Sequence, residues 1–398
     1  MTLSLDRVFE AQQVLKSILR ETKCVRSYGI ANECELYLKP ENLQITGSFK
    51  VRGSGYKIAM LSEKEKKNGV IACSAGNHAQ GVALAATKNG IKSLICLPGV
   101  APISKVEATK HYGAEVELVG GCYDDAYARA IELKDERNLT FVHPFDDENV
   151  ILGQGTIALE ILSDLDNIDA IVVPVGGGGL ISGIAYVVKQ IRPSVKVFGV
   201  QVSGAPSMFN SIKSGNIECL DSVTTIADGI AVKEPGQNTF EIVKKYVDDM
   251  ALVTDDEVAS AILALIEKQK MIAEGAGATA VAAVMFDKFK LKNKKVVCVV
   301  SGGNIDVTSL SRVIDRGLMN SGRSSSLLIE LMDKPGQLKA ISRIIADAGG
   351  NVTGVHYEKG NTLHINGCFL RIEMETRDFE HVNIIKKALL DEGFKITE

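Results

Sequence analysis

The sequence predicts an α/β protein in which parallel sheets carry helices on both faces, followed by a smaller α+β domain with a ferredoxin-like order. The first half of this prediction comes from residues 69–300, where short, continuously apolar runs alternate with helical segments. Such runs are typical of parallel strands that are buried on both faces. The second half comes from the residues after 326, where the order changes to β-α-β-β-α-β.

The individual elements follow in chain order. A helix is expected over 5–21, because Val8, Leu15 and Ile18 recur at helical spacing, and a short strand at 36–38 ends before Pro40. Further strands are predicted at 69–73, 93–97, 114–119, 141–142, 170–173, 195–202 and 294–300. Helices are predicted at 49–61, 77–89, 103–112, 123–136, 153–162, 180–191, 255–268 and 277–289.

A polar, turn-forming stretch begins at Asn320 and separates two predicted domains. The first domain covers residues 1–320 and contains a smaller inserted subdomain at roughly 50–150, and residues 321–325 form the linker. The second domain, 326–398, has expected strands at 327–332, 351–357, 367–375 and 394–396 and expected helices at 337–348 and 378–392. A domain of only ~70 residues has little core of its own, so pairing with a second copy is expected.

Composition excludes several classes of protein. The chain has 398 residues, 45% apolar and 24% charged, with a formal net charge of −4, which gives no electrostatic reason to expect nucleic acid or an anionic membrane as partner. No apolar run approaches the ~20 residues that span a bilayer, and the N-terminus lacks the apolar core of a signal peptide. Eight scattered cysteines form no C-x-x-C pair, which favours reduced thiols and a cytoplasmic location.

A lysine stretch, residues 44–53, carries the first chemical signal. Thr46 to Ser48 form a predicted loop that caps a helix from about Phe49, so Lys50 would lie at a helix N-terminus. The positive end of a helix lowers the pKa of a nearby ammonium, and a deprotonated lysine can form a Schiff base. The alternative is an ordinary solvated lysine at the start of a helix.

A glycine loop, Gly176 to Gly179, lies between the apolar strand that ends at Pro174 and the helix from Leu180. Its amide groups and the helix dipole suit a phosphate. A dinucleotide site is the alternative, but Ile181 occupies the position where G-x-G-x-x-G requires its last glycine, and no P-loop lysine follows. A simple tight turn is the other alternative.

Two further stretches follow buried strands. The first, Ser74-Ala75-Gly76-Asn77-His78, gathers hydroxyl, amide and backbone donors that suit an amino-acid carboxylate and a phenolic oxygen, although it could be an ordinary helix cap. The second is Ser301-Gly302-Gly303-Asn304.

These four stretches in this order resemble those of the fold-type II enzymes that use pyridoxal phosphate, the tryptophan synthase β-like fold. The closest resemblance is to the threonine ammonia-lyases, and it covers about residues 5–320. The turn Asp333-Lys334-Pro335-Gly336 resembles the acidic-x-Pro-Gly turn of ACT regulatory domains.

The resemblance implies roles for the residues of the site. Lys50 would hold the cofactor and remove the Cα proton, with Ser74 as a second catalytic residue, and Glu274 would support the site. The cofactor would be bound by Phe49, Lys50, Asn77, Gly176, Gly177, Gly178, Gly179, Leu180 and Ser301. The substrate carboxylate would be bound by Ser74, Ala75, Gly76, Asn77 and His78.

The activity implied is the β-elimination of water from L-threonine, which yields 2-oxobutanoate and ammonia, with L-serine giving pyruvate as a side reaction. The neutral hydroxyl of Ser301 facing the pyridine nitrogen would favour elimination over transamination. The resemblance further implies a homotetramer, a role as the first step of isoleucine biosynthesis, and an effector site near Pro335 and Gly336 for isoleucine or valine.

Three alternatives remain. One is a catabolic threonine or serine dehydratase activated by a nucleotide, and a second is a non-catalytic amino-acid sensor. The third is a serine racemase, whose family carries a metal on a Glu and an Asp where this chain has Gln201 and Ser207. Since two neutral groups are poor ligands for a hard cation, no metal is expected there.

Overall fold

The computed structural model describes residues 2–358 and 367–397. It divides into two compact units, Met1–Val307 and Thr308–Glu398. Within the described ranges, no helix combines the length and the apolar character that crossing a bilayer demands.

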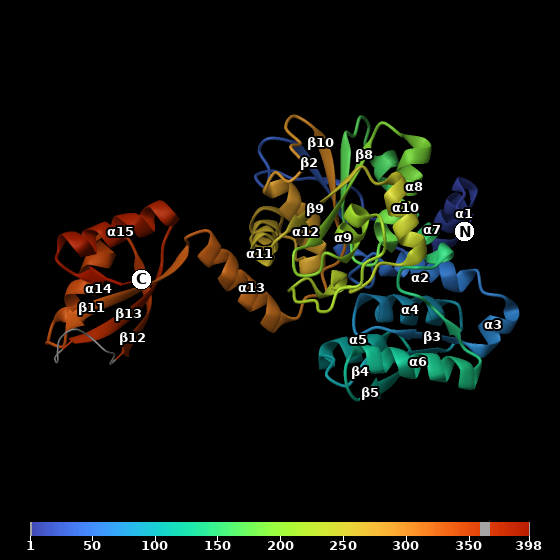
Figure 1. The fold of residues 1–398 in the computed structure, drawn as a ribbon, viewed down its shortest axis with the longest axis horizontal. Coiled ribbons are helices and arrows are strands. Elements are labelled where there is room, and N and C mark those ends of the chain that lie inside the picture. The colour runs from blue at the N-terminus through green and yellow to red at the C-terminus, as the bar shows by residue number, and fades with distance from the viewer. Residues whose placement is uncertain (1, 359–366, 398) are drawn as a thin grey trace. The chain divides into compact units, whose positions relative to one another are not determined.

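The larger sheet of the first unit has six strands and is parallel except at one edge (Figure 1). The two strands at that edge pair antiparallel, and every other pair of neighbouring strands in the sheet is parallel. In spatial order the strands are β1 (Val25–Arg26), β2 (Glu35–Pro40), β10 (Lys295–Val300), β7 (Ala170–Pro174), β8 (Lys196–Val202) and β9 (Asp249–Val253).

Helices cover both faces of this sheet. The first face carries a large apolar core shared by α1 (Leu5–Leu15), α7 (Glu148–Asp164), α8 (Gly179–Ile191) and α10 (Gln237–Tyr246). On the other face α12 (Gly275–Met285) packs on the strands, with α11 (Asp255–Ala264) against it. The predicted doubly covered parallel sheet is therefore confirmed.

The smaller sheet has four parallel strands, in the order β5 (Glu115–Val119), β4 (Ser93–Pro98), β3 (Val70–Cys73) and β6 (Thr140–Phe141). One face packs against α4 (Asn77–Lys88) and α5 (Ile103–His111), and the other against α6 (Tyr123–Arg137). Figure 1 shows these elements together as the blue-green part of the first unit. Helix α2 (Lys50–Ala59) packs on both α4 and α7, so it joins the two sheets, and α3 (Glu63–Asn68) follows it.

The second unit contains the predicted β-α-β-β-α-β order. It comprises α13 (Val307–Asn320), β11 (Ser324–Met332), α14 (Gln337–Asp347), β12 (Asn351–Glu358), β13 (Gly367–Glu375), α15 (Phe379–Asp391) and β14 (Lys395–Ile396). The sheet is antiparallel with the order β12-β13-β11-β14, and an apolar core lies between it and the two helices α14 and α15. This is the ferredoxin-like arrangement.

Several boundaries differ from the predictions. Helix α1 ends at Leu15 rather than near 21, and α7 begins at Glu148 rather than 153, because the Asp147 carboxylate accepts hydrogen bonds from the next amides and caps the helix. Strands β1 and β9 and helices α3, α9 (Ser207–Ser214), α10 and α13 were not predicted. The second compact unit begins at Thr308, whereas the predicted domain boundary lies at 320, and β11 already begins inside the predicted linker.

Candidate active site

The lysine stretch and the Ser301 stretch lie side by side. Lys50 is the first residue of α2, and its neighbour Phe49 occupies the N-cap position without any side-chain cap, so the predicted cap by Thr46 or Ser48 is wrong. The Phe49 amide instead donates to the carbonyl oxygen of Ser301 across 3.0 Å, and Ser48 pairs with Gly302 in an isolated β-bridge. The start of α2 is therefore held by the end of β10.

The amine of Lys50 lies in a poorly solvated place although the residue as a whole is partly accessible. Its Nζ donates to the carbonyl oxygen of Pro144 across 2.9 Å and stands 5.4 Å from the ring centroid of Phe49. Burial lowers the pKa of Lys50 to about 8, against the opposing charge of Glu274. The predicted direction is the one found, and burial, which the sequence argument did not include, is its main cause. A useful fraction of free amine is thus available near neutral pH.

A chain of side-chain amides and one carboxylate ties these stretches together. Asn304 Nδ2 donates to Asn77 Oδ1 across 2.7 Å, and Asn77 Nδ2 donates to Glu274 Oε1 across 2.6 Å. The Glu274 amide in turn donates to the carbonyl oxygen of Gly302 across 3.1 Å. Burial, with the charge of Asp228 as a smaller cause, raises the pKa of Glu274 to about 7.

The Ser74–His78 stretch connects β3 to α4 and leaves donors open. Ser74 Oγ accepts a hydrogen bond from the Gly76 amide across 3.2 Å, and α4 begins at Asn77 without a side-chain cap. The amides of the first turn of α4 therefore have no partner inside the helix. His78 is only 3% exposed, and its Nε2 lies 2.8 Å from the Val142 carbonyl oxygen. Burial, followed by the charge of Lys50, lowers the pKa of His78 to about 3, so its ring is neutral.

The glycine loop joins β7 to α8 and fits an anionic group. Within the described chain, no backbone acceptor takes the amide hydrogens of Gly176, Gly177 or Gly178, and Gly179 opens the helix. Gly178 has φ +98°, and a Cβ there would stand 2.7 Å from a Met208 carbon. Free amides at a helix N-terminus, together with a poorly solvated lysine amine, are a donor set that suits a phosphorylated aldehyde.

Phe145 links this loop to the lysine. A Cβ on Gly177 would stand 2.5 Å from the Phe145 ring, and the preceding residue, Pro144, accepts the hydrogen bond from Lys50. The structure therefore brings all four predicted stretches and Glu274 to one place, where α2 joins the two sheets. Whether each residue has its predicted role stays a prediction.

Two parts of this region were not predicted. One is residues 142–147, for which the sequence offers only the His-Pro pair as a signal. The other is an ion network behind Lys50: Arg52 forms two-pronged bonds of 2.7–2.8 Å to Glu41 and to Glu160, and Lys39 pairs with Glu160 at 2.5 Å. Arg52, Glu41 and Lys39 are each 0% exposed. Nothing in the spacing of these residues signals that they meet.

The two residues at the positions where a serine racemase would bind its metal, Gln201 and Ser207, make other contacts in this chain. Gln201 Oε1 accepts from the Phe209 amide across 2.7 Å, and Ser207 Oγ donates to the Val232 carbonyl oxygen across 2.7 Å. Among the residues that the structure describes, no three metal-binding side chains gather anywhere. The expectation that the chain needs no metal stays a prediction.

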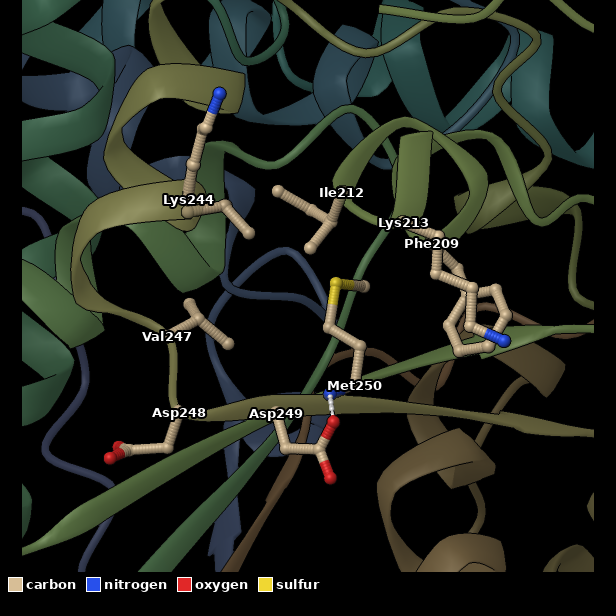
Figure 2. A pocket seen from close by; sticks show the side chains of 9 residues that line it. Phe209, Ile212, Lys213, Lys244, Val247, Asp248, Asp249 and Met250 are labelled. Atoms are coloured by element: carbon tan, nitrogen blue, oxygen red, sulfur yellow. Dashed lines mark hydrogen bonds between the residues drawn. The ribbon is translucent and has the colours of Figure 1, made fainter. Parts of the chain in front are cut away.

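A separate surface hollow of about 150 Å³ lies between α9, α10 and β9 (Figure 2). Its walls are the apolar side chains of Phe209, Ile212, Val247 and Met250, and its rim includes Asp249. None of the predicted site residues lines it. The predicted effector residues Pro335 and Gly336 belong to the second unit, in the turn before α14, where Gly336 has φ +92°.

The arrangement in the first unit defines a class of protein, an enzyme that holds a phosphorylated aldehyde through a lysine. The protein-family model described as pyridoxal-phosphate dependent enzyme matches residues 15–302. An L-threonine ammonia-lyase of Thermotoga maritima is 48% identical over 397 residues, 99% of each chain. The L-threonine dehydratase catabolic TdcB of Escherichia coli K12 is 44% identical over 317 residues, which are 79% of this chain and 96% of that protein.

Two solved structures resemble most of this chain. Threonine deaminase isoform 2 of Solanum lycopersicum has a TM-score of 0.76 at 36% identity, covering 80% of this chain and 90% of that one. A maize serine racemase has a TM-score of 0.75 at 34% identity, covering 80% and 99%. The chain therefore belongs to the pyridoxal-phosphate dependent enzymes of fold type II, in their threonine ammonia-lyase group. It is a lyase that depends on pyridoxal phosphate.

Proposed function

We propose that this enzyme converts L-threonine to 2-oxobutanoate and ammonia, with L-serine to pyruvate as a slower side reaction. The observation that carries the proposal is the match to an L-threonine ammonia-lyase over 99% of both chains, which includes the second unit. The poorly solvated amine of Lys50, with a pKa lowered to about 8, supplies the base that such a reaction requires.

The residues would divide the work as follows. Bound pyridoxal phosphate supplies an electron-withdrawing ring that stabilises negative charge at the substrate Cα. Gly176 to Gly179 would hold its phosphate with their open amides, and Lys50 would hold its carbonyl carbon until the substrate amine takes that place and frees the Lys50 amine. The open donors of the Ser74–His78 stretch bind the substrate carboxylate. This orients the Cα–H bond toward the Lys50 amine, which takes the proton.

Loss of the β-hydroxyl follows the loss of the α-proton. Ser301 is 3% exposed at the end of β10, and a neutral hydroxyl at the pyridine nitrogen would not keep a proton there. Negative charge at Cα would then be short-lived, which favours immediate departure of the neighbouring hydroxyl over reprotonation. The released enamine hydrolyses in water to the 2-oxo acid and ammonia. Ser74 remains our candidate for the second catalytic residue.

Discrimination between threonine and serine depends on one methyl group. A single methyl in an apolar pocket is worth roughly 10–200-fold in specificity. Serine turnover is therefore expected as a side reaction, whereas a racemase would return D-serine. The match to a maize serine racemase at 34% identity keeps that alternative open to assay.

We also propose that the second unit is a regulatory domain of the ACT type, and that the enzyme acts in isoleucine biosynthesis as a homotetramer in the cytoplasm. The ferredoxin-like sheet and the Asp333-Lys334-Pro335-Gly336 turn support the assignment of an ACT-type domain. A catabolic role is the second candidate, favoured by 44% identity to the catabolic dehydratase, although that match spans only 79% of this chain. Isoleucine and valine would inhibit or modulate the first kind of enzyme, and nucleotides would activate the second.

The test measures 2-oxobutanoate, pyruvate, D-serine and ammonia from L-threonine and L-serine. We expect 2-oxobutanoate and ammonia in equal amounts and faster than pyruvate. Borohydride reduction followed by peptide mapping should recover the cofactor on Lys50. Lys50→Ala should lose turnover, whereas Lys64→Ala on the exposed α3 should not. D-serine as the main product, or full turnover by Lys50→Ala, would contradict the proposal.

A further inference from the structure

The six residues 142–147, which we call the 142–147 segment, connect β6 to α7 and touch several parts of the site. The Val142 carbonyl oxygen lies 2.8 Å from His78 Nε2, and the Pro144 carbonyl oxygen accepts from Lys50 Nζ across 2.9 Å. The Phe145 ring lies against Gly177 of the glycine loop. A single short segment therefore contacts the lysine, the Ser74–His78 stretch and the glycine loop.

The same segment also holds the helix behind the glycine loop. Asp146 Oδ1 accepts from the amides of Asn238 and Thr239 at the start of α10, each across 3.1 Å. The hydroxyl of Thr239, which is 0% exposed, donates to the Gly177 carbonyl oxygen across 2.6 Å. This carbonyl is therefore engaged by α10, while the loop amides have no backbone acceptor within the described chain. The position of the glycine loop thus depends on the 142–147 segment through Phe145 and through Asp146.

The shape of the segment depends in turn on His143. Its Nδ1 accepts hydrogen bonds from the amides of Phe145, across 3.3 Å, and of Asp146, across 2.8 Å. A ring nitrogen that accepts from two amides carries no hydrogen, so the imidazole is neutral with its proton on Nε2. These two bonds curl the chain around Pro144, which has no amide hydrogen of its own. The Pro144 carbonyl is left facing Lys50.

We propose that His143 is a positioning residue for the cofactor site. By accepting two backbone hydrogen bonds at Nδ1, it keeps the Pro144 carbonyl on the Lys50 amine and the Phe145 ring on the glycine loop. The inference rests on the proposed roles of Lys50 and of the glycine loop, but not on the identity of the substrate.

Protonation of His143 would undo this arrangement. It would convert Nδ1 from an acceptor into a donor, and both amide bonds would be lost. The charged and titratable groups around the ring are Lys50 on α2, His78 on α4, and Asp146 and Asp147 in the segment itself. Burial lowers the pKa of His143 below its ordinary value of 6.5, more than the two aspartates raise it. The neutral form therefore persists at neutral pH, and the segment loosens only as the pH falls.

The experiment compares His143→Asn with His143→Leu in the full chain. An asparagine oxygen can accept from the amides two and three residues later, as in a helix cap, whereas leucine fills similar space without an acceptor. Holoenzyme is dialysed to equilibrium at pH 7.5, and the dissociation constant of pyridoxal phosphate is read from the absorbance of the bound cofactor. We expect His143→Leu to raise this constant about tenfold or more, equivalent to 1.4 kcal/mol, and His143→Asn to stay within about threefold of wild type.

His381 is the matched control. It lies in the second unit, where its Nδ1 also accepts a backbone hydrogen bond, from Arg377 across 3.1 Å. His381→Leu should leave cofactor affinity unchanged, with far-UV circular dichroism confirming that each variant is folded. Equal affinity of His143→Leu and wild type, or equal weakening by His143→Asn and His143→Leu, would overturn the proposal.

A pH series adds a second readout. The ratio of the wild-type to the His143→Asn dissociation constant cancels the titration of Lys50, which both proteins share. This ratio should rise as the pH falls through the lowered pKa of His143, because only wild type can protonate the ring. A ratio that stays flat while the His143 ring protonates, as followed by NMR of the imidazole, would contradict the pH part of the inference. Failure of wild type to turn over threonine while it still binds the cofactor would instead refute the proposed function and leave this inference standing.

Discussion

The side-chain amide of Asn77 donates to the Glu274 carboxylate across 2.6 Å, in a place where Glu274 is 5% exposed. This bond joins the start of α4 to the start of α12, and so joins the smaller sheet to the larger one. Because burial raises the pKa of Glu274 to about 7, the carboxylate changes charge within the working range of an enzyme. The Asn77 amide therefore donates to a neutral carboxyl group below neutral pH and to a charged carboxylate above it.

The first prediction concerns stability and Glu274→Gln. The folded pKa of about 7 lies above the ordinary 4.5, so the folded chain holds this proton more tightly than the unfolded chain. The contribution is fully present below pH 4.5 and is lost as the pH rises through 7. Relative to Glu274→Gln, wild type should lose on the order of 3 kcal/mol between these pH values, at about 1.4 kcal/mol per pKa unit.

Urea denaturation at pH 5 and pH 7.5 measures this difference. Glu63→Gln, a change in an exposed carboxylate on α3, is the control and should follow wild type at both values. If the difference between wild type and Glu274→Gln stays constant across the two pH values, the raised pKa is wrong.

The second prediction concerns the ion network behind Lys50. Arg52→Met leaves Glu41 and Glu160 with only Lys39 as a buried cation, and removal of one partner from a buried ion pair costs about 3–5 kcal/mol. The double variant Arg52→Met/Glu41→Met leaves the neutral pair Lys39–Glu160. It should therefore be more stable than Arg52→Met alone.

Urea midpoints of the three proteins provide the measurement. Arg129 on α6 is the control, because its partners Glu117, Glu132 and Glu136 are on the surface, and Arg129→Met should leave the midpoint almost unchanged. The prediction would be wrong if the double variant were less stable to urea than Arg52→Met by the full cost of a second lost partner. That result would show that the charges contribute to stability independently.

The third prediction concerns the glycine loop. Gly178 has φ +98°, and a Cβ there would press on Met208 and Thr239 at 2.7–2.8 Å. Gly178→Ala should therefore displace the loop and weaken binding of pyridoxal phosphate by at least tenfold. Equilibrium dialysis of the holoenzyme measures the dissociation constant of pyridoxal phosphate for each variant.

Gly215 provides a control for backbone strain alone. Its φ is +81° at the end of α9, and a Cβ there would meet nothing within 4 Å. Gly215→Ala should cost some stability and leave cofactor binding intact. Equal loss of cofactor by the two variants would mean that strain, and not the geometry of the loop, explains the effect.

The sequence predicted the architecture well because buried parallel strands are continuously apolar. β3, β4, β7 and β10 are almost entirely buried, and each was found within one or two residues. β9 is a half-exposed edge strand, with Asp249 at its start and only two buried residues, so its pattern resembled that of a loop. Helix α10 was missed because its cap is not local: the Asp146 carboxylate that accepts from its first amides comes from a distant part of the chain.

The site could be predicted only where one local stretch carries the signal. The lysine stretch, the Ser74–His78 stretch, the glycine loop and the Ser301 stretch are each contiguous, and their order identified the family. Arg52 acts through Glu160, far along the chain, and the local bonds of His143 matter only because the 142–147 segment meets Lys50 and the glycine loop in the fold. A single sequence contains no record of such long-range contacts. The helix-dipole argument gave the right direction for Lys50, but only the fold could show that desolvation is the larger cause.

The last prediction concerns the second unit. Truncation after Arg323 removes β11 to β14 and keeps α13. The catabolic dehydratase of Escherichia coli, 96% of which is matched over 317 residues, is a relative of similar length to the truncated chain. The truncated enzyme should retain threonine turnover and lose its response to isoleucine, valine or nucleotides, because coupling requires an effector that binds two states unequally. Titration of each effector into both proteins measures the response.

Two glycine variants of the full chain locate the effector site more closely. Gly336→Ala should weaken the effector response, whereas Gly393→Ala should not. Both glycines have positive φ and open space around a Cβ, but only Gly336 lies in the proposed effector turn. A response that survives truncation would move the effector site into the first unit.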